Sequence, residues 1–525
     1  MNLRDSLLDV LKSLPGTREF HIHTLVSAPS KTRKLFPYVS PRPRVWQQHI
    51  IVLASEQPSI AQPRVFVTAV EAYFYAIPST RSGILYVSKV DSTGQGKKPS
   101  PTSAIVKRLI RFYVNPNTRP NVGGAGDLIE YVWVHVFARA QGQYLFPNSA
   151  DFEGKNPLSD VKLCAWWKAV FASVAEQLSK RTGRKEGERV NLWHVLPGLN
   201  ELEALQALRS ASTNPNQSST SDLSSIAWTY GHPSTQKLDD VNSIPLPCPA
   251  DGKGGTSGGF NLGRFIPSFE DDPKARFMDE IAHTTNSDVI KSPVRKRAKK
   301  TADEDVHEVE KKESSRTGEL EKVTPGEYWE RMSFRQECVA GIVTGFFAMG
   351  YASPPAREGI EGLGFAPQPG QVSSNITKRV MNSLMTGMEF STFERAVRGT
   401  EMLEAAIKGM CEGISVGVEV DPPRPRQEPR QKTPEPTERY DHLAVPPRTP
   451  PRGTEVGRSS VATEISPNPF PEPTASLETY TSWIYGSACV DNPLPAKPSG
   501  EREGPDKASG RTITVLAVRK KRKKE

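Results

Sequence analysis

Arg64-Val-Phe-Val-Thr-Ala-Val-Glu-Ala-Tyr-Phe-Tyr-Ala76 decides the fold, because its β-branched and aromatic residues partly alternate along the run. This pattern predicts a half-buried strand. The following residues, Pro78-Ser-Thr-Arg-Ser-Gly83, have the composition of a turn, and Ile84–Lys89 is a second strand-like run. We therefore predict a β-hairpin. His49–Ala54 is a compact β-branched run that predicts a further strand.

Helical patterns flank these strands along the chain. Apolar spacing predicts a helix at Leu3–Leu14, a second helix capped by Thr102 or Ser103, and a third that begins at Ser159-Asp160. Tyr131–Ala138 alternates like another strand. The third helix contains Trp166-Trp167, whose rings point about 100° apart, so that one faces the core and the other can line a pocket. These elements predict a mixed α/β core.

Length and composition predict one sizeable core with long disordered segments. Of 525 residues, 36% are hydrophobic and 46 are proline, too many prolines for regular structure throughout. No run of about 18 apolar residues and no signal peptide are present, so we expect neither membrane insertion nor secretion. The predicted segments are 1–197, first part of the core; 198–259, flexible insertion; 260–286, short ordered segment; 287–323, charged disordered insertion; 324–415, helical part of the core, with helices at 326–350 and 373–412; and 416–525, Pro-rich disordered tail with a basic C-terminus, in which Thr512–Val518 can add a strand.

Positive charge is concentrated in two clusters. The net charge is +9, and the excess peaks at Lys291–Lys300 and Arg519–Lys524. Such clusters are typical of nuclear import signals or of contacts with nucleic acid or acidic proteins, and a solvated tail without a partner is the alternative. The five cysteines are scattered without C-x-x-C spacing, so neither a disulfide framework nor a metal site is predicted. P-loop, zinc-protease and kinase motifs are also absent from the sequence.

Two short segments combine residues suited to chemistry. Asp271-Asp-Pro-Lys-Ala-Arg-Phe277 places two carboxylates beside two cations, which suits a general base with a tuned pKa. The same residues also suit an ordinary helix cap with local ion pairs. Asp91-Ser-Thr-Gly-Gln-Gly-Lys-Lys98 precedes a helix, and it is either a phosphate-binding loop or an ordinary flexible loop.

Five blocks, in this order, resemble the fungal histone acetyltransferase family first named for regulating transposon transposition. They are Val87-Ser-Lys-Val-Asp91, Gln143-Tyr-Leu-Phe-Pro147, Trp166-Trp167, Leu192-Trp193 and Asp271–Phe277. The resemblance implies a CBP-like α/β fold with a mixed central sheet surrounded by helices. It implies a nuclear enzyme that transfers acetyl groups from acetyl-CoA to lysines of newly synthesised histone H3. It further implies work with histone chaperones in nucleosome assembly and genome stability, without direct nucleic-acid binding as the primary activity.

The same resemblance implies the site residues. The acetyl-CoA site would comprise Val90, Asp91, Ser92, Pro99, Ser100, Pro101, Thr102, Ser103, Phe137, Gln141, Asn156, Pro157, Leu158 and Trp166. The substrate-lysine site would comprise Asp272, Asp271, Trp167, Tyr144 and Asp91. Asp272 is our choice for the carboxylate that accepts or orients the proton, and Lys274 would be acetylated by the enzyme itself. No metal is implied. The resemblance also makes residues 1–197 the acetyl-CoA-binding part of the core and residues 260–286 the active-site segment.

A catalytically inactive nuclear scaffold is the competing hypothesis. Such a protein would keep the fold and bind histones or chaperones without turnover. Intact Asp91, Tyr144, Trp167 and Asp272 favour the enzyme, because a decayed site is expected to have lost several of them.

Overall fold

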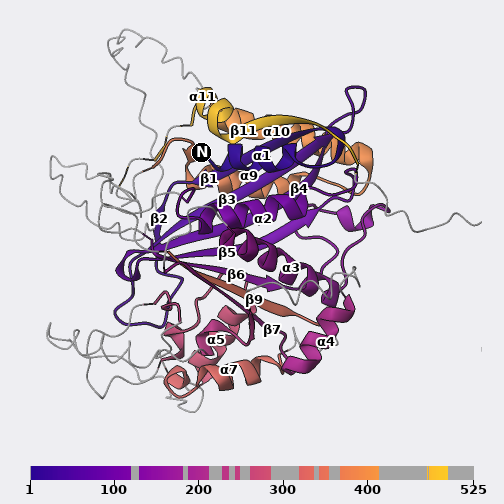
Figure 1. The fold of residues 1–525 in the computed structure, drawn as a ribbon. Helices are drawn as coiled ribbons and strands as arrows, with labels where there is room; N and C mark the ends of the chain where they lie inside the picture. The colour runs from indigo at the N-terminus through magenta and orange to yellow at the C-terminus, as the bar shows by residue number, and fades with distance from the viewer. Residues whose placement is uncertain are drawn as a thin grey trace, which may run out of the picture.

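The computed structural model describes residues 2–119, 129–180, 187–211, 227–235, 243–248, 261–284, 318–335, 342–353, 367–412, 470, 472–473 and 475–494 (Figure 1). The helices are α1 (Leu3–Lys12), α2 (Thr102–Val114), α3 (Asp160–Ser179), α4 (Glu201–Ala211), α5 (Pro273–Thr284), α7 (Pro325–Met332), α9 (Ser374–Gly387), α10 (Phe393–Glu412) and α11 (Leu477–Thr479). The strands are β1 (Gly16–Ser27), β2 (Ser30–Thr32), β3 (Val45–Gln57), β4 (Val65–Ile77), β5 (Ser82–Ser92), β6 (Tyr131–Ala138), β7 (Arg189–Val195), β8 (Trp228–Tyr230), β9 (Gly345–Ala352), β10 (Gln371–Val372) and β11 (Tyr485–Asn492).

One mixed sheet contains all eleven strands of the described chain. Its order is β10-β1-β3-β4-β5-β6-β9-β7-β8, with β11 paired to β1 and β2 paired to β3. Most neighbours are antiparallel, whereas β5 and β6 run parallel and are joined through α2. A parallel pair needs such a crossover connection, because its second strand must start at the same end as the first.

Helices cover both faces of the sheet (Figure 1). On one face, α1, α2, α3 and α4 share the largest apolar core with the strands. On the other face, α9 and α10 pack over the half that holds β1, β3 and β4. The helices α5 and α7 form a separate apolar cluster that includes Val195 of β7 and Phe346 of β9. The predicted mixed sheet surrounded by helices is confirmed.

The central hairpin also agrees with the prediction. Antiparallel pairing joins β4 to β5 from Thr68↔Ser92 to Ile77↔Ser82. Arg81 in the turn has a φ of 49°, in the left-handed region. The third predicted helix is α3, with Ser159 at its N-cap, but α2 begins after Pro101 and has no side-chain cap from Thr102 or Ser103.

The predicted helix at 326–350 is wrong in its second half. Residues 325–332 form α7, but 345–352 form β9, which lies between β6 and β7. All eight residues of β9 are buried. A strand covered on both faces has a continuous apolar sequence, and such a sequence resembles the continuation of a buried helix.

Two segments predicted as disordered contain core elements. The 198–259 segment contains α4, with Leu208 in the main core, and β8, which pairs with β7. The 416–525 tail contains β11, which pairs with β1 along eight residues. The 324–415 segment is not purely helical, because it contains β9 and β10. The predicted strand at Thr512–Val518, the two basic clusters and most of 287–323 lie outside the described residues.

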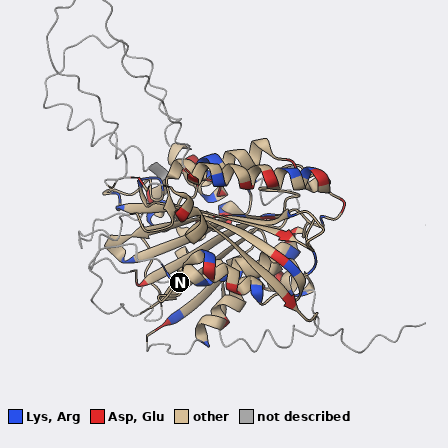
Figure 2. Ribbon diagram, turned by 90° about the horizontal axis from the view of Figure 1, so that it is seen from above, with Lys and Arg blue, Asp and Glu red and all other residues tan. Residues whose placement is uncertain are grey.

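In Figure 2, the ribbon positions of Lys, Arg, Asp and Glu gather on the helices and toward the ends of the strands, and most of the sheet is tan. Within the residues that the structure describes, no helix combines the length and apolar character needed to cross a membrane.

The docking of β11 on β1 depends on Val490, which is 3% exposed and belongs to the main core. We predict that Val490→Asp will speed amide exchange across residues 485–492, because a carboxylate without a partner is costly to bury. Hydrogen exchange monitored by mass spectrometry will measure this. Cys489→Asp is the matched control, since Cys489 is exposed. Equal protection in both variants would show that β11 does not need this core contact.

Candidate active site

A pocket of about 480 Å³ lies at the carboxyl ends of β5 and β6. The two strands are parallel, so these ends meet at the same edge of the sheet. Residues from the starts of α2 and α3 and from the loop at 139–158 complete the wall. In α/β proteins, the carboxyl ends of parallel strands and the helices that follow them commonly form ligand sites.

Most of the predicted site residues meet in this pocket. From the predicted substrate site, Asp91, Tyr144, Trp167 and Asp271 line it. From the predicted acetyl-CoA site, the lining residues are Val90, Asp91, Ser92, Ser100, Thr102, Ser103, Phe137, Gln141, Asn156, Pro157, Leu158 and Trp166. The structure describes all the predicted site residues, and those that are not part of the wall are Pro99, Pro101, Asp272 and Lys274.

Asp91 fixes one side of the pocket. Its Oδ2 accepts hydrogen bonds from the three successive backbone amides of Tyr144–Phe146, at 2.7, 2.8 and 3.1 Å. Its Oδ1 accepts from the Ser92 amide at 2.8 Å and from Lys155 Nζ at 2.9 Å. With five donors on two oxygens, this carboxylate is suited to holding the 144–146 loop against β5.

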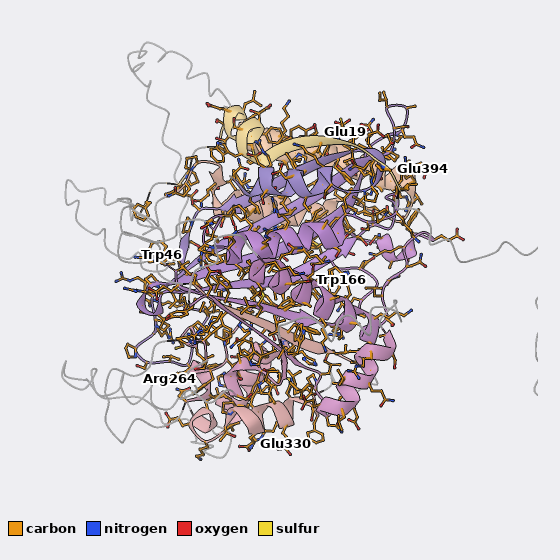
Figure 3. The ribbon with its side chains drawn as sticks, viewed as in Figure 1. Glu19, Trp46, Trp166, Arg264, Glu330 and Glu394 are labelled. Carbon is orange, nitrogen blue, oxygen red and sulfur yellow. The ribbon has the colours of Figure 1, made fainter. Side chains whose placement is uncertain are left out.

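Aromatic side chains form much of the remaining wall. Trp166, labelled in Figure 3, lies on α3. Its ring meets that of Trp167 edge to face, with ring centroids 4.7 Å apart. Trp167 is 5% exposed and belongs to the main core, whereas Trp166 is partly buried, as the 100° offset predicts. Both still reach the pocket. The Tyr144 hydroxyl donates to the Arg139 carbonyl, and burial raises the pKa of that hydroxyl to about 12.

Asp271 is the carboxylate of the Asp271–Phe277 segment that lines the pocket. Its side chain is 53% exposed, and its Oδ2 accepts a hydrogen bond from Lys89 Nζ at 2.7 Å. Ser88 Oγ lies 3.5 Å from the same oxygen. A carboxylate at this place can meet the ammonium group of an incoming lysine.

Asp272, our choice for the carboxylate that accepts or orients the proton, does not line the pocket. Asp272 is fully buried, forms an ion pair with Lys274, and accepts the Lys274 backbone amide at 2.8 Å. Lys274 is 1% exposed, and its Nζ lies 4.5 Å from the centre of the Phe346 ring. Burial lowers the pKa of Lys274, while the Asp272 carboxylate opposes that shift. Asp272 is therefore held inside the protein, whereas the neighbouring Asp271 lines the pocket.

Two buried histidines lie beside this ion pair. His135 and His232 stack with ring centroids 5.7 Å apart, and His232 Nδ1 contacts Ser234 Oγ at 2.9 Å. Burial, reinforced by the positive charge of Lys274, lowers the pKa of His135 to about 3 and that of His232 well below its usual value. The histidines are therefore neutral neighbours that leave Asp272 as the counterion of Lys274.

The glycine-containing loop at 91–98 is not an open phosphate cradle. The Lys97 amide donates to Glu56 Oε1 at 3.1 Å, and the Gln95 amide donates to Thr93 Oγ1 at 3.3 Å. The Arg18 guanidinium holds the Lys97 carbonyl at 2.8 Å. Because its backbone is tied to the protein, the loop instead positions the start of α2, where Ser100, Thr102 and Ser103 line the pocket.

Sequence reasoning left four cationic residues of the pocket wall out of the predicted site, namely Lys89, Arg139, Lys155 and Arg276. Lys89 precedes Asp91 by two residues within a strand-like block, and this spacing was a usable signal. Lys155 lies in an irregular segment, and its contact with Asp91 joins residues 64 apart. No local pattern predicts such a contact.

The family description "Histone acetyltransferase KAT11-type domain" matches residues 6–119 and 128–406. The chain therefore belongs to the KAT11-type histone acetyltransferase domain family, which confirms the resemblance seen in the sequence and agrees with the predicted enzyme class.

The chain is also similar to two curated proteins and to one solved structure. The chain is 25% identical over 356 residues to histone acetyltransferase rtt109 of Aspergillus flavus, covering 64% of this chain and 54% of the relative. It is 23% identical over 291 residues to histone acetyltransferase rtt109 of Schizosaccharomyces pombe, covering 55% and 58%. The chain thus spans little more than half the length of these relatives. The crystal structure of Rtt109 from Aspergillus fumigatus matches with a TM-score of 0.54 at 23% identity, covering 77% of this chain and 94% of that chain, which supports the fold.

We predict that Asp91→Asn will lower the free energy of unfolding by about 1–3 kcal/mol, because an amide nitrogen will face backbone N–H groups or Lys155. The affinity for acetyl-CoA should fall with it. Urea denaturation and calorimetric titration measure the two effects. Asp151→Asn, an exposed change in the same loop, is the control. If both variants behave like the wild type, Asp91 does not hold the pocket wall.

Proposed function

We propose that this chain transfers the acetyl group of acetyl-CoA to histone lysines. The observation that carries the proposal is a single pocket that unites residues from β5, β6, α2, α3, the 139–158 loop and the segment before α5. These residues were predicted from separate blocks of sequence, and they meet in a chain of the KAT11-type family.

The pocket chemistry suits acetyl-CoA as a co-substrate. Ser100, Thr102 and Ser103 offer hydroxyl groups at the start of α2, where the helix dipole favours the negative charge of phosphates. Leu163 and Trp166 provide apolar surface for the pantetheine arm.

The transfer requires a neutral lysine amine. The amine attacks the thioester carbonyl, a C–N bond forms, the C–S bond breaks, and CoA leaves as its thiol. The ammonium proton must first be removed, and the amine must be oriented. We assign the contact with the ammonium group of the substrate lysine to Asp271, because its exposed carboxylate lies on the pocket wall. Trp167 and Tyr144 would flank the lysine's aliphatic stem.

Self-acetylation of Lys274 is part of the proposal. Acetylation replaces a buried ammonium by a neutral amide, which removes the cost of burying that charge and changes the electrostatic surroundings of Asp272. Lys274 is enclosed between Asp272 and the Phe346 ring. Its amine must therefore reach the thioester either before this packing forms or while the packing is open.

Histone H3 as the substrate, histone chaperones as partners and the nucleus as the location belong to the same proposal. They rest on the resemblance of the sequence blocks, and the names of the relatives add only that those proteins acetylate histones. The basic clusters at Lys291–Lys300 and Arg519–Lys524 suit nuclear import.

The proposal predicts acetyl transfer by the purified full chain. Labelled acetyl-CoA is incubated with histone H3–H4, alone and with each of several chaperones, and mass spectrometry maps the acetylated lysines of both histone and enzyme. We expect modified H3 and modified Lys274. Binding of histones without any transfer under all conditions would favour the inactive scaffold instead.

The two neighbouring aspartates should respond differently to loss of charge. Asp271→Asn should lower kcat while the melting temperature stays near that of the wild type. Asp272→Asn should destabilise the protein with unacetylated Lys274 by about 3–5 kcal/mol, because it strips a buried cation of its counterion. Steady-state kinetics and thermal melting separate the outcomes. A stable, inactive Asp272→Asn protein beside a fully active Asp271→Asn protein would return the direct role to Asp272.

A further inference from the structure

A register shift between β4 and β5 determines where Lys89 points. Glu71 pairs with Lys89, but the next residue, Ala72, pairs with Val87, so Ser88 is an extra residue in β5. An extra residue reverses the faces on which the following side chains lie. Val87 packs in the core beneath α2, whereas Lys89 lies on the opposite face beside Glu71.

Glu71 is fixed on that face by its neighbours. Val70 and Ala72 belong to the core beneath α2, so Glu71 between them points to the other side of the sheet. His49 Nε2 lies 3.0 Å from Glu71 Oε1, and the Tyr73 hydroxyl donates to the same oxygen at 3.0 Å. The His49 and Tyr73 rings stack with centroids 4.6 Å apart.

Lys89 bridges this buried carboxylate and the pocket. Its Nζ donates to Glu71 Oε2 and to Asp271 Oδ2, both at 2.7 Å. Exposure rises along the series, because the side chain of Glu71 is 5% exposed, that of Lys89 26% and that of Asp271 53%. The ion pairs thus lead from the interior of the sheet to the pocket wall.

Glu71 and Lys89 stabilise each other's charge. Burial would raise the pKa of the Glu71 carboxyl, but the His49 hydrogen bond and the Lys89 charge lower it to about 2. Burial would lower the pKa of Lys89, but Glu71 and Asp271 raise it above its usual value. Lys89 is therefore a fixed cation and is not suited to be an acetyl acceptor.

We propose that Lys89 is a positioning residue for acetyl transfer, which it serves by fixing Asp271 for the substrate lysine. An exposed ion pair normally orders its partners weakly, but Glu71 anchors Lys89 from the buried side. Lys89 occupies Oδ2 of Asp271, and among the described residues no hydrogen bond reaches Oδ1. That oxygen is left for the incoming ammonium group. This inference rests on the proposed function.

A double-mutant cycle tests the proposal. Lys89→Met and Asp271→Asn should each lower kcat/KM for histone by about 10- to 100-fold, mainly through kcat, since small misplacements of a reacting group cost this much. Because Lys89 acts through Asp271, the double variant should be no worse than Asp271→Asn alone. The Kd for acetyl-CoA should change less than twofold, and Lys89→Arg should restore most of the rate.

Controls keep the outcomes distinct. Lys180→Met removes an exposed lysine that is paired with Glu176 on α3, and it should leave the rate unchanged. Glu71→Gln, which keeps the shape but removes the anchoring charge, should lower the melting temperature and, at an assay temperature where the variant is still folded, reproduce part of the Lys89→Met loss of kcat. If the wild type is active and the loss of kcat/KM in the double variant is the product of the two single losses, the positioning role of Lys89 is overturned and the proposed function stands. Absence of transfer by the wild type would overturn the proposed function itself.

Discussion

The single extra residue in β5 is the constraint on which the pocket depends. Beyond Ser88, the side chains of β5 exchange faces, and this exchange sends Lys89 toward Asp271 and Asp91 toward the 144–146 loop. Bulges are common beside active sites because they aim side chains that regular alternation would send elsewhere. Here the bulge lies in the half of β5 that leads to the pocket, while the regular half pairs with β6.

Buried charges then hold the parts together. Asp91 ties a loop to β5, Asp272 ties Lys274 beneath the pocket, and Arg18 and Glu56 tie the segment before α2. Each is a contact between a charged side chain and groups that have lost most of their water, so each is sensitive to the loss of either partner. Such contacts restrict the motion of segments from distant parts of the chain, and these segments form the walls of the pocket.

The sequence allowed the hairpin, most helices and most pocket residues to be predicted, because their signals are local or belong to recognisable blocks. It did not allow β9 to be separated from a helix, because all eight of its residues are buried and its apolar run has no period. It also missed β11, which has little apolar character and whose pairing with β1 spans the length of the chain. The different burial of Asp271 and Asp272 could not be predicted for a similar reason. Two adjacent carboxylates at the start of a helix look alike in sequence, and only packing decides which one the solvent reaches.

The position of β11 also bears on how shortened forms of this chain would behave. It covers the edge of β1 from Gly16 to His23, and its residues come after the described part of α10 by more than seventy positions. A fragment that stops after α10 would leave eight consecutive residues of β1 with an open edge. Open edges recruit strands from other molecules. Self-association of such a fragment would then report a missing neighbour rather than an intrinsic tendency of the catalytic core to oligomerise.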